Sequence, residues 1–356
     1  MLAFRRLAAI IVVGILAVGC GGEPARVPAV VPPAPAARAP TRPAAPALAR
    51  WTPFVHVSSP IDVVGPRRGG ALVVAANGRL RLLSRAGALR GYAQRAGALR
   101  GYAPSYKSNP GLEAYIALAA ARRPGCSFGA DTVYAISFGK PRGVVAIDAG
   151  GRIRPFAAIS APGLIDGIAF DDTGRFGYRL LVATTAGPRT SVDAVDCQGR
   201  VSTITTRAHR VEGGIAVAPA SFGAFAGDLI ASDELGGGIY AIAPNGRTRL
   251  AARSGLPHGG DTGVESEAFL PARGRFTAIL ADRLTPGNRH PGDNVLLRVS
   301  SAALFAAGAR PGDLLDATEG GAKTVAVHCG ASGCTVRHVA DGPAVAHPEG
   351  HVAIVG

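Results

Sequence analysis

The sequence predicts an all-β protein, a β-propeller of six blades closed by pairing of N- and C-terminal strands. A unit of about 47 residues, made of short β-rich runs separated by turns, occurs twice between Leu164 and Arg253, and this period is typical of propeller blades. The composition, with 49 Gly, 27 Pro and one Met, favours short strands and tight turns over helices. The run 349–355 repeats the pattern of an inner strand without outer strands after it, so we expect it to complete a blade with N-terminal strands.

The N-terminus has the pattern of an export signal. Arg5 and Arg6 precede an apolar run too short to cross a bilayer comfortably, and small residues then lead to Cys20. This stretch resembles the lipobox of bacterial lipoproteins, except that Ala17 stands where Leu is usual. The resemblance implies a signal peptide over 1–19, lipidation of Cys20 and attachment to the extracytoplasmic face of the cell membrane. An ordinary secretory signal is the alternative.

The next segment, residues 20–50, carries the anchor cysteine and is rich in Pro and Ala without apolar periodicity. We expect an extended tether there, followed by the propeller domain over 51–356. The net charge of +14 comes mainly from dispersed Arg. Because a nucleic-acid site needs clustered cations and stacking aromatics, we expect no nucleic-acid partner.

Four cysteines remain outside the signal region, and an even number in an exported chain favours disulfides. Cys329 and Cys334 would close the loop of a hairpin, which leaves Cys126 and Cys197 as the second pair. A zinc site is the weaker interpretation, because the spacing of zinc-binding cysteines is absent.

Strand-like runs follow the tether in order, at 54–57, 61–64, 71–75, 80–83, 112–118, 132–136, 143–148 and 153–156, then in the two repeated units, then at 265–270, 276–280, 294–299, 324–328 and 335–339. Asn77-Gly78 predicts a type I′ hairpin, since both residues tolerate positive φ. We expect 265–270 to pair with 276–280. We also expect the strand 349–355 to join the blade whose outer strands lie near 71–83.

Hairpin turns near positions 78, 151, 199, 246, 300 and 332 give six blades, with five or seven as alternatives. A nine-residue stretch at 85–93 is repeated at 95–103. We interpret this duplication as a lengthened loop rather than as an anion-binding strip, because loops lengthen at little thermodynamic cost.

Carboxylates stand at the start of the expected inner strands, at Glu113, Asp166, Glu212, Glu267 and Glu349. Inner strands line the central channel of a propeller, so equivalent positions on successive blades converge at one end of it. Carboxylates gathered without counter-charge repel one another, and oxygen ligands suit a hard cation. These five residues therefore predict a calcium site. The alternative is that they cap turns or pair with the numerous arginines.

The run from Asp166 to Gly174, Asp-Gly-Ile-Ala-Phe-Asp-Asp-Thr-Gly, resembles a phrase of NHL-type propellers and of the senescence-marker-protein/gluconolactonase family. Glu212-Gly213 and Glu349-Gly350 are similar to the Glu-Gly that opens the metal site of that family. The resemblance implies a six-bladed, calcium-binding lactone hydrolase with Asp166 as a ligand. The sequence departs from the family in lacking counterparts of its asparagine ligands.

Two further groups of residues carry possible chemistry. His258 lies in a Gly-rich loop with Glu265 and Glu267, and its imidazole is a candidate general base; a solvated loop is the alternative. His347, Glu349 and His351 alternate along one strand and give a weaker hypothesis of a zinc site.

Two functions are therefore expected. The first is a lipid-anchored module at the cell envelope that binds a small molecule or an envelope protein without catalysis. The alternative is a calcium-dependent, lactonase-like hydrolase with Asp166, Glu212 and Glu267 as ligands. The sequence does not decide whether the protein is an enzyme, but the missing asparagines favour the binding module.

Overall fold

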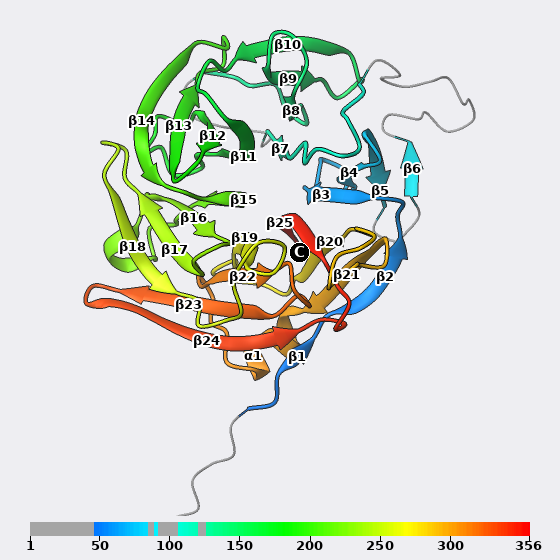
Figure 1. The fold of residues 1–356 in the computed structure, drawn as a ribbon, viewed down its shortest axis with the longest axis vertical. Coiled ribbons are helices and arrows are strands. Elements are labelled where there is room, and N and C mark those ends of the chain that lie inside the picture. Colours follow the sequence, from blue (N-terminus) through cyan, green and yellow to red (C-terminus); the bar gives the residue numbers. More distant parts are fainter. Residues whose placement is uncertain (1–45, 85–88, 92–105, 120–125) are drawn as a thin grey trace, which may run out of the picture. The chain divides into compact units, whose positions relative to one another are not determined.

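The computed structural model of the chain describes residues 46–84, 89–91, 106–119 and 126–356, which belong to one unit that begins at Ala45. Their strands form six sheets arranged as blades around a common axis (Figure 1). The predicted all-β propeller of six blades is thus confirmed. The predicted signal peptide, Cys20, most of the tether and most of the duplicated stretch at 85–103 lie outside the described residues.

Blades 1 to 4 follow the chain without interruption, and each begins with the strand nearest the axis. Their strands are β3 (Pro60–Val64), β4 (Leu72–Ala76), β5 (Arg79–Leu83) and β6 (Leu89–Gly91); β7 (Ile116–Leu118), β8 (Val133–Ser137), β9 (Gly143–Ile147) and β10 (Ile153–Ala158); β11 (Leu164–Phe170), β12 (Leu180–Ala186), β13 (Arg189–Val195) and β14 (Val201–His209); and β15 (Glu212–Val217), β16 (Leu229–Asp233), β17 (Gly238–Ile242) and β18 (Thr248–Arg253). The two repeated units of the sequence are blades 3 and 4.

Blades 5 and 6 are interleaved along the chain. After the inner strand of blade 5 the chain builds two strands of blade 6, returns to complete blade 5, and finishes with the inner strand of blade 6. From the axis outward, blade 5 contains β19 (Val264–Phe269), β22 (Leu314–Thr318), β23 (Thr324–Gly330), β24 (Gly333–Asp341) and β1 (Ala49–Arg50); blade 6 contains β25 (Pro348–Val355), β20 (Thr277–Asp282), β21 (Val295–Ser300) and β2 (Thr52–His56). The N-terminal strands therefore complete both blades.

This interleaving corrects two predicted pairings. The strand at 264–269 pairs with β22 and not with 277–282, and β25 pairs with β20 and not with the strands near 71–83. The prediction that N- and C-terminal strands complete one blade is confirmed, because β2 and β25 lie in the same blade. They occupy opposite edges of that sheet and are joined through β20 and β21.

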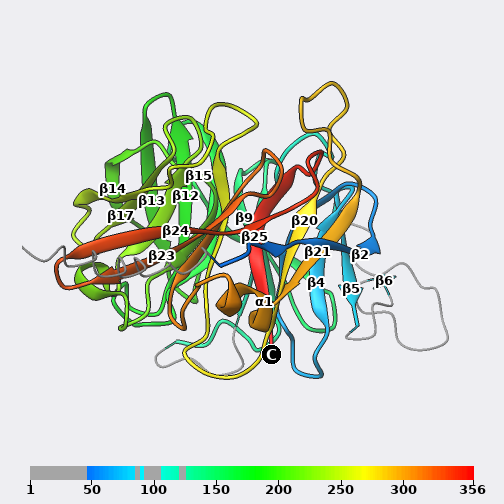
Figure 2. The same cartoon turned by 90° about the horizontal axis from the view of Figure 1, so that it is seen from below.

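Helices are short in the described part of the chain. The α-helix α1 (Ser301–Ala306) links blade 6 back to blade 5, and a 3-10 turn, η1 (Gly223–Phe225), lies between β15 and β16. Neither has the length and apolar composition needed to span a bilayer. Figure 2 shows the blades from the side, with α1 beside the outer part of blades 5 and 6.

Local sequence signals are confirmed at two turns. Asn77 and Gly78 both have positive φ, 49° and 64°, in the turn between β4 and β5. Cys329 faces Cys334 across the hairpin of β23 and β24 and is bonded to it, with Cα atoms 4.0 Å apart. The second predicted disulfide, Cys126–Cys197, is present as well, with Cα atoms 5.6 Å apart. It connects the segment before β8 to the hairpin turn of blade 3.

Apolar side chains fill the spaces between neighbouring blades. In the largest cluster, Phe128, Tyr134 and Phe170 pack edge to face with ring centroids 5.0 to 5.6 Å apart. Burying side chains of this kind contributes roughly 1.5–3 kcal/mol each, so the inter-blade layers hold the ring together. The ring positions the six inner strands, and residues at or near the starts of three of them contribute to the site described next.

Candidate functional site

Carboxylates lie at or near the starts of several inner strands. Glu113 precedes β7, whereas Glu265 and Glu349 are the second residues of β19 and β25. The three residues bring one carboxylate oxygen each within 4.8 Å of the others. The Tyr115 hydroxyl lies among them, 2.5 Å from Glu265, 3.1 Å from Glu113 and 3.3 Å from Glu349. A hydroxyl donates one hydrogen, so it cannot satisfy three carboxylates at once.

A guanidinium contacts this group from the solvent side. Arg283 directly follows β20, and its Nη1 lies 3.2 Å from Glu113 Oε1 and 3.2 Å from Glu349 Oε1. The side chain of Arg283 is 14% exposed and that of Glu113 is 27% exposed, whereas Glu349 is buried at 1%. The site is therefore closed at Glu349 and reaches solvent past Glu113 and Arg283.

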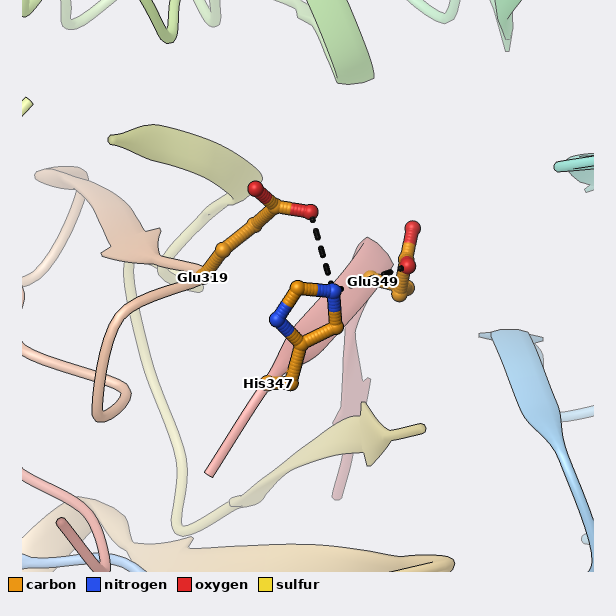
Figure 3. A group of neighbouring side chains, drawn as sticks. All are labelled: Glu319, His347 and Glu349. Atoms are coloured by element: carbon orange, nitrogen blue, oxygen red, sulfur yellow. Dashed lines mark ion pairs between the residues drawn. The ribbon is translucent and has the colours of Figure 1, made fainter. Parts of the chain in front are cut away.

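A histidine and a further carboxylate adjoin Glu349 (Figure 3). His347 precedes β25, and Glu319 follows β22 in blade 5. The Nε2 atom of His347 lies 3.5 Å from Glu319 Oε1 and 3.5 Å from Glu349 Oε1. All three residues are buried.

The electrostatics of the site follow from burial and from like charges. The charge of Glu349 and burial raise the pKa of Glu113 to about 8, although Arg283 acts in the opposite direction. Burial, and then the charge of Glu349, raises the pKa of Glu265 well above its usual range. Burial and the neighbouring Glu265 do the same for Glu319. These carboxyl groups are unfavourable as anions unless a positive charge joins them.

The five carboxylates predicted as calcium ligands are divided by the structure. Glu113 and Glu349 lie together in the group described above. Glu212 forms an ion pair with Arg210 instead, and Asp166 is buried with an Oδ1 atom that has no partner among the described residues. Burial raises the pKa of Asp166 well above its usual range and raises that of Glu212.

Glu267 lies deeper, in a separate pair. It faces Asp316 across β19 and β22, and the Ser232 hydroxyl contacts both carboxyl groups, at 3.0 Å and 2.7 Å. Each carboxyl keeps one buried oxygen without a partner in the described part of the chain. Burial raises the pKa of Asp316 to about 7, so the pair shares protons rather than carrying two full charges.

The Glu-Gly pairs that resemble a metal-site motif also have a packing role. Gly350, with φ of 67°, lies where a Cβ would come within 2.7 Å of Asp62 Oδ1. Gly213, with φ of 83°, lies where a Cβ would overlap the side chain of Glu265. Both positions combine a left-handed backbone with close contact to the neighbouring inner strand, so glycine is required there whatever the site binds.

The remaining predicted residues lie apart from the acidic group. His258 is exposed, and its Nδ1 lies 3.1 Å from the Leu235 carbonyl oxygen. His351 points to Asp62, whose oxygens lie 2.9 and 3.1 Å from its Nδ1. Burial lowers the pKa of His351, but Asp62 and further hydrogen bonds outweigh this effect and raise it. His351 therefore serves the fold of the channel rather than the group around Glu349.

Sequence reasoning missed several participants. Asp62 occupies the inner-strand position in β3, and the run Ile61-Asp62-Val63-Val64 carries the same signal as the carboxylates that were recognised. Glu319 and Arg283 follow second strands of blades, so the inner-strand pattern could not identify them. Tyr115 stands two residues after Glu113 and has the alternation that places it on the same side of the channel.

The other ends of the inner strands line a cavity of about 640 Å³. Its apolar lining residues include Val64, Leu118, Ala169, Phe170, Ala216, Val217, Ala268, Phe269, Val352 and Ile354. Charged and titratable residues line it as well, namely Arg67, Arg68, Asp131, Asp172, Glu267 and His351. This cavity therefore combines apolar residues of the inner strands with charged residues of both signs.

Neither a protein-family model nor a curated protein matches this sequence. Among solved structures, the fold is similar to virginiamycin B lyase from Staphylococcus aureus, at 10% identity and a TM-score of 0.44, over 79% of this chain and 70% of that one. It is also similar to a gluconolactonase-like protein, at 14% identity and a TM-score of 0.35, over 72% and 93% of the two chains. A third similar structure is that of a putative oxidoreductase (glucose dehydrogenase) from Thermus thermophilus, at 16% identity and a TM-score of 0.34, over 70% and 99% of the two chains. These likenesses concern the fold alone.

Proposed function

We propose that this chain is a lipid-anchored, extracytoplasmic β-propeller that acts as a binding module and takes up a cation at the acidic end of its channel. The observation that supports the proposal is the imbalance of charge there. Four carboxyl groups, those of Glu113, Glu265, Glu319 and Glu349, adjoin one another, and Arg283 supplies one guanidinium to two of them. A bound cation would relieve this repulsion.

The location at the cell envelope rests on different residues. The sequence before Cys20 has the pattern of a lipoprotein signal, and the folded part carries two disulfides. Disulfides persist in oxidising compartments outside the cytoplasm, so their presence supports export. A cation held at the mouth of the channel would then face ligands or envelope proteins outside the membrane.

Calcium-dependent hydrolysis of a lactone is the alternative function. It needs a general base beside the cation, and the predicted base, His258, bonds to a backbone carbonyl in an exposed loop. His258 also lies outside the three groups of residues with ligand atoms in mutual reach. Binding is therefore the better supported function. Lactone hydrolysis that requires both the cation and His258 would reverse this preference.

The cation proposal is tested by thermal unfolding of the purified full-length chain in EDTA and with added Ca²⁺, Mn²⁺ or Zn²⁺. We expect at least one cation to raise the Tm, because a ligand that binds only the folded state stabilises it by mass action. Glu349→Gln should remove the effect, since Glu349 belongs to two of the three groups. Asp228→Asn is the matched control, because Asp228 is also buried but pairs with Arg249 outside the site. Equal Tm values under all conditions would refute the proposal.

The anchor is tested by cell fractionation of a Cys20→Ser variant. We expect the parent chain in the membrane fraction, solubilised by detergent but not by salt, because several acyl chains give stable anchoring. The variant should lose membrane attachment. Membrane retention of Cys20→Ser equal to that of the parent would contradict lipidation at this residue.

A further inference from the structure

Three groups of described residues bring ligand atoms within 4.8 Å of one another at the acidic end of the channel. They are Glu113–Glu265–Glu349, Glu234–Asp261–Glu319 and Glu319–His347–Glu349. The first already contains protein donors, the Tyr115 hydroxyl and the Arg283 guanidinium. The second includes the exposed Asp261 and offers oxygen atoms alone. The third differs from both because it contains an imidazole nitrogen and is buried throughout.

The imidazole of His347 lies between two carboxylates without a normal hydrogen bond to either. Its Nε2 is 3.5 Å from both Glu319 Oε1 and Glu349 Oε1, whereas a charge-assisted N–H···O bond measures about 2.7–2.9 Å. Figure 3 shows Nε2 directed into the space between the two carboxylates. His347 is 2% exposed, and its Nδ1 atom has no partner among the described residues.

These spacings match ligands that share one ion. Zinc–nitrogen and zinc–oxygen bonds of about 2.0–2.2 Å at a tetrahedral angle separate the ligand atoms by about 3.4 Å. The two distances of 3.5 Å agree with that separation. A small closure of the carboxylates around an ion would therefore complete the site without rearranging the strands that hold it.

The donor set distinguishes between classes of cation. Calcium takes six to eight oxygen ligands and seldom a nitrogen, whereas imidazole with carboxylates suits zinc and neighbouring transition metals. Arg283 contacts Glu113 Oε1 and Glu349 Oε1, so it reduces the negative charge of two carboxylates in the first group. In the third group it contacts one carboxylate, through the same Glu349 oxygen that lies 3.5 Å from His347 Nε2. The nitrogen-containing group is thus the better match to a borderline metal ion.

We propose that Glu319, His347 and Glu349 form the binding site of a zinc-class divalent ion. This inference rests on the proposed function, which requires only that some cation binds at the acidic end. Three protein ligands leave at least one position of a tetrahedral ion open. An oxygen-donor ligand, such as a carboxylate or carbonyl group reaching past Glu113 and Arg283, is the class of molecule that fits this position.

The inference is tested by equilibrium dialysis of the full-length chain against Zn²⁺, Co²⁺ or Ca²⁺, with bound metal measured by elemental analysis. We expect Zn²⁺ and Co²⁺ to bind far more tightly than Ca²⁺, and bound Co²⁺ to give the visible absorption of a low-coordinate site. Loss of outer-shell partners commonly weakens metal binding about 10–100-fold, so loss of a ligand in His347→Gln or Glu319→Gln should weaken it by at least about 100-fold. His258→Gln removes an imidazole outside the group and should leave affinity unchanged.

Far-UV circular dichroism in EDTA establishes that each variant folds. If a variant does not fold, X-ray absorption at the zinc edge of the parent chain still decides the question, because imidazole gives a distinct outer-shell signal. A zinc spectrum with oxygen ligands alone would overturn the inference. So would Ca²⁺ binding as tight as Zn²⁺ binding together with unchanged affinity in His347→Gln. Those two results would leave the proposed function in place. If the chain binds no cation at all, the proposed cation-binding function and the zinc-class site are both refuted.

Discussion

Two buried carboxylates of the channel have opposite surroundings. Asp62 accepts hydrogen bonds from the backbone N–H groups of Val63, Ile116 and His351, each 2.8 Å long, and contacts the His351 imidazole. Glu265 lies among other carboxyl groups and receives a bond from the Tyr115 hydroxyl. Both are almost completely buried, at 0% and 2% exposure.

The difference lies in the number of donors. Asp62 has its oxygens satisfied by three inner strands, β3, β7 and β25, so its negative charge stabilises the ring. Glu265 has more acceptors than donors around it, so its charge opposes folding until a proton or a cation arrives. Burial of a carboxylate therefore does not by itself indicate a ligand site, whereas a shortage of donors does.

The largest expected effect is that of Asp62→Asn. The amide removes the charge and turns an NH₂ group toward backbone N–H donors, so the free energy of unfolding should fall by about 3 kcal/mol or more. Denaturant unfolding followed by fluorescence measures it. Asp196→Asn is the control, because Asp196 also accepts backbone N–H bonds but lies in an exposed turn. A loss no greater than that of the control would contradict a structural role for Asp62.

The next effect is a dependence of stability on pH. The pKa of Asp316 is about 7 in the folded chain, above its unfolded value near 4, so the folded chain binds more protons between these values. Its contribution to the free energy of unfolding should decrease as pH rises from about 4 to 7, by up to about 1.4 kcal/mol per pH unit. Asp316→Asn should flatten that part of the curve. Identical pH profiles of parent and variant would show that the Glu267–Asp316 pair does not share protons.

Glu265→Gln should change the free energy of unfolding in the opposite direction to Asp62→Asn. In EDTA at pH 8 the variant avoids the cost of burying an acidic group among other carboxyl groups but keeps an oxygen that accepts from Tyr115, so we expect stability to rise by about 1 kcal/mol. Denaturant unfolding of parent and variant under the same conditions gives the comparison. If both substitutions destabilise the chain equally, the contrast between the two environments is wrong.

The smallest effect is expected for Glu212→Gln. Glu212 is partly exposed and pairs with Arg210, which is also partly exposed, and such pairs contribute little. The free energy of unfolding should change by no more than about 0.5 kcal/mol. Cation binding should change little too, because Glu212 lies outside the three groups of possible ligands. A large loss of cation affinity would restore Glu212 to the site predicted from the sequence.

The sequence predicted the fold class, the hairpin at Asn77-Gly78 and both disulfides, because these follow from local patterns and from repeats. The strand partners predicted for β19 and for β25 were wrong. An inner strand can pair with any second strand of suitable pattern, and the choice depends on long-range packing. The same limit applied to the site. Glu113 and Glu349 were found through their positions in inner strands, whereas Glu319 comes from a loop after a second strand.

The interleaving of blades 5 and 6 also sets when the site can exist. Residues 347 and 349 follow the other strands of both blades along the chain, and β25 is the strand that fills the inner position of blade 6. Blade 6 is incomplete until β25 has been synthesised, and a chain clipped before residue 347 lacks two of the three proposed ligands. The proposed site at Glu319, His347 and Glu349 would therefore be absent from a chain whose ring has not yet closed.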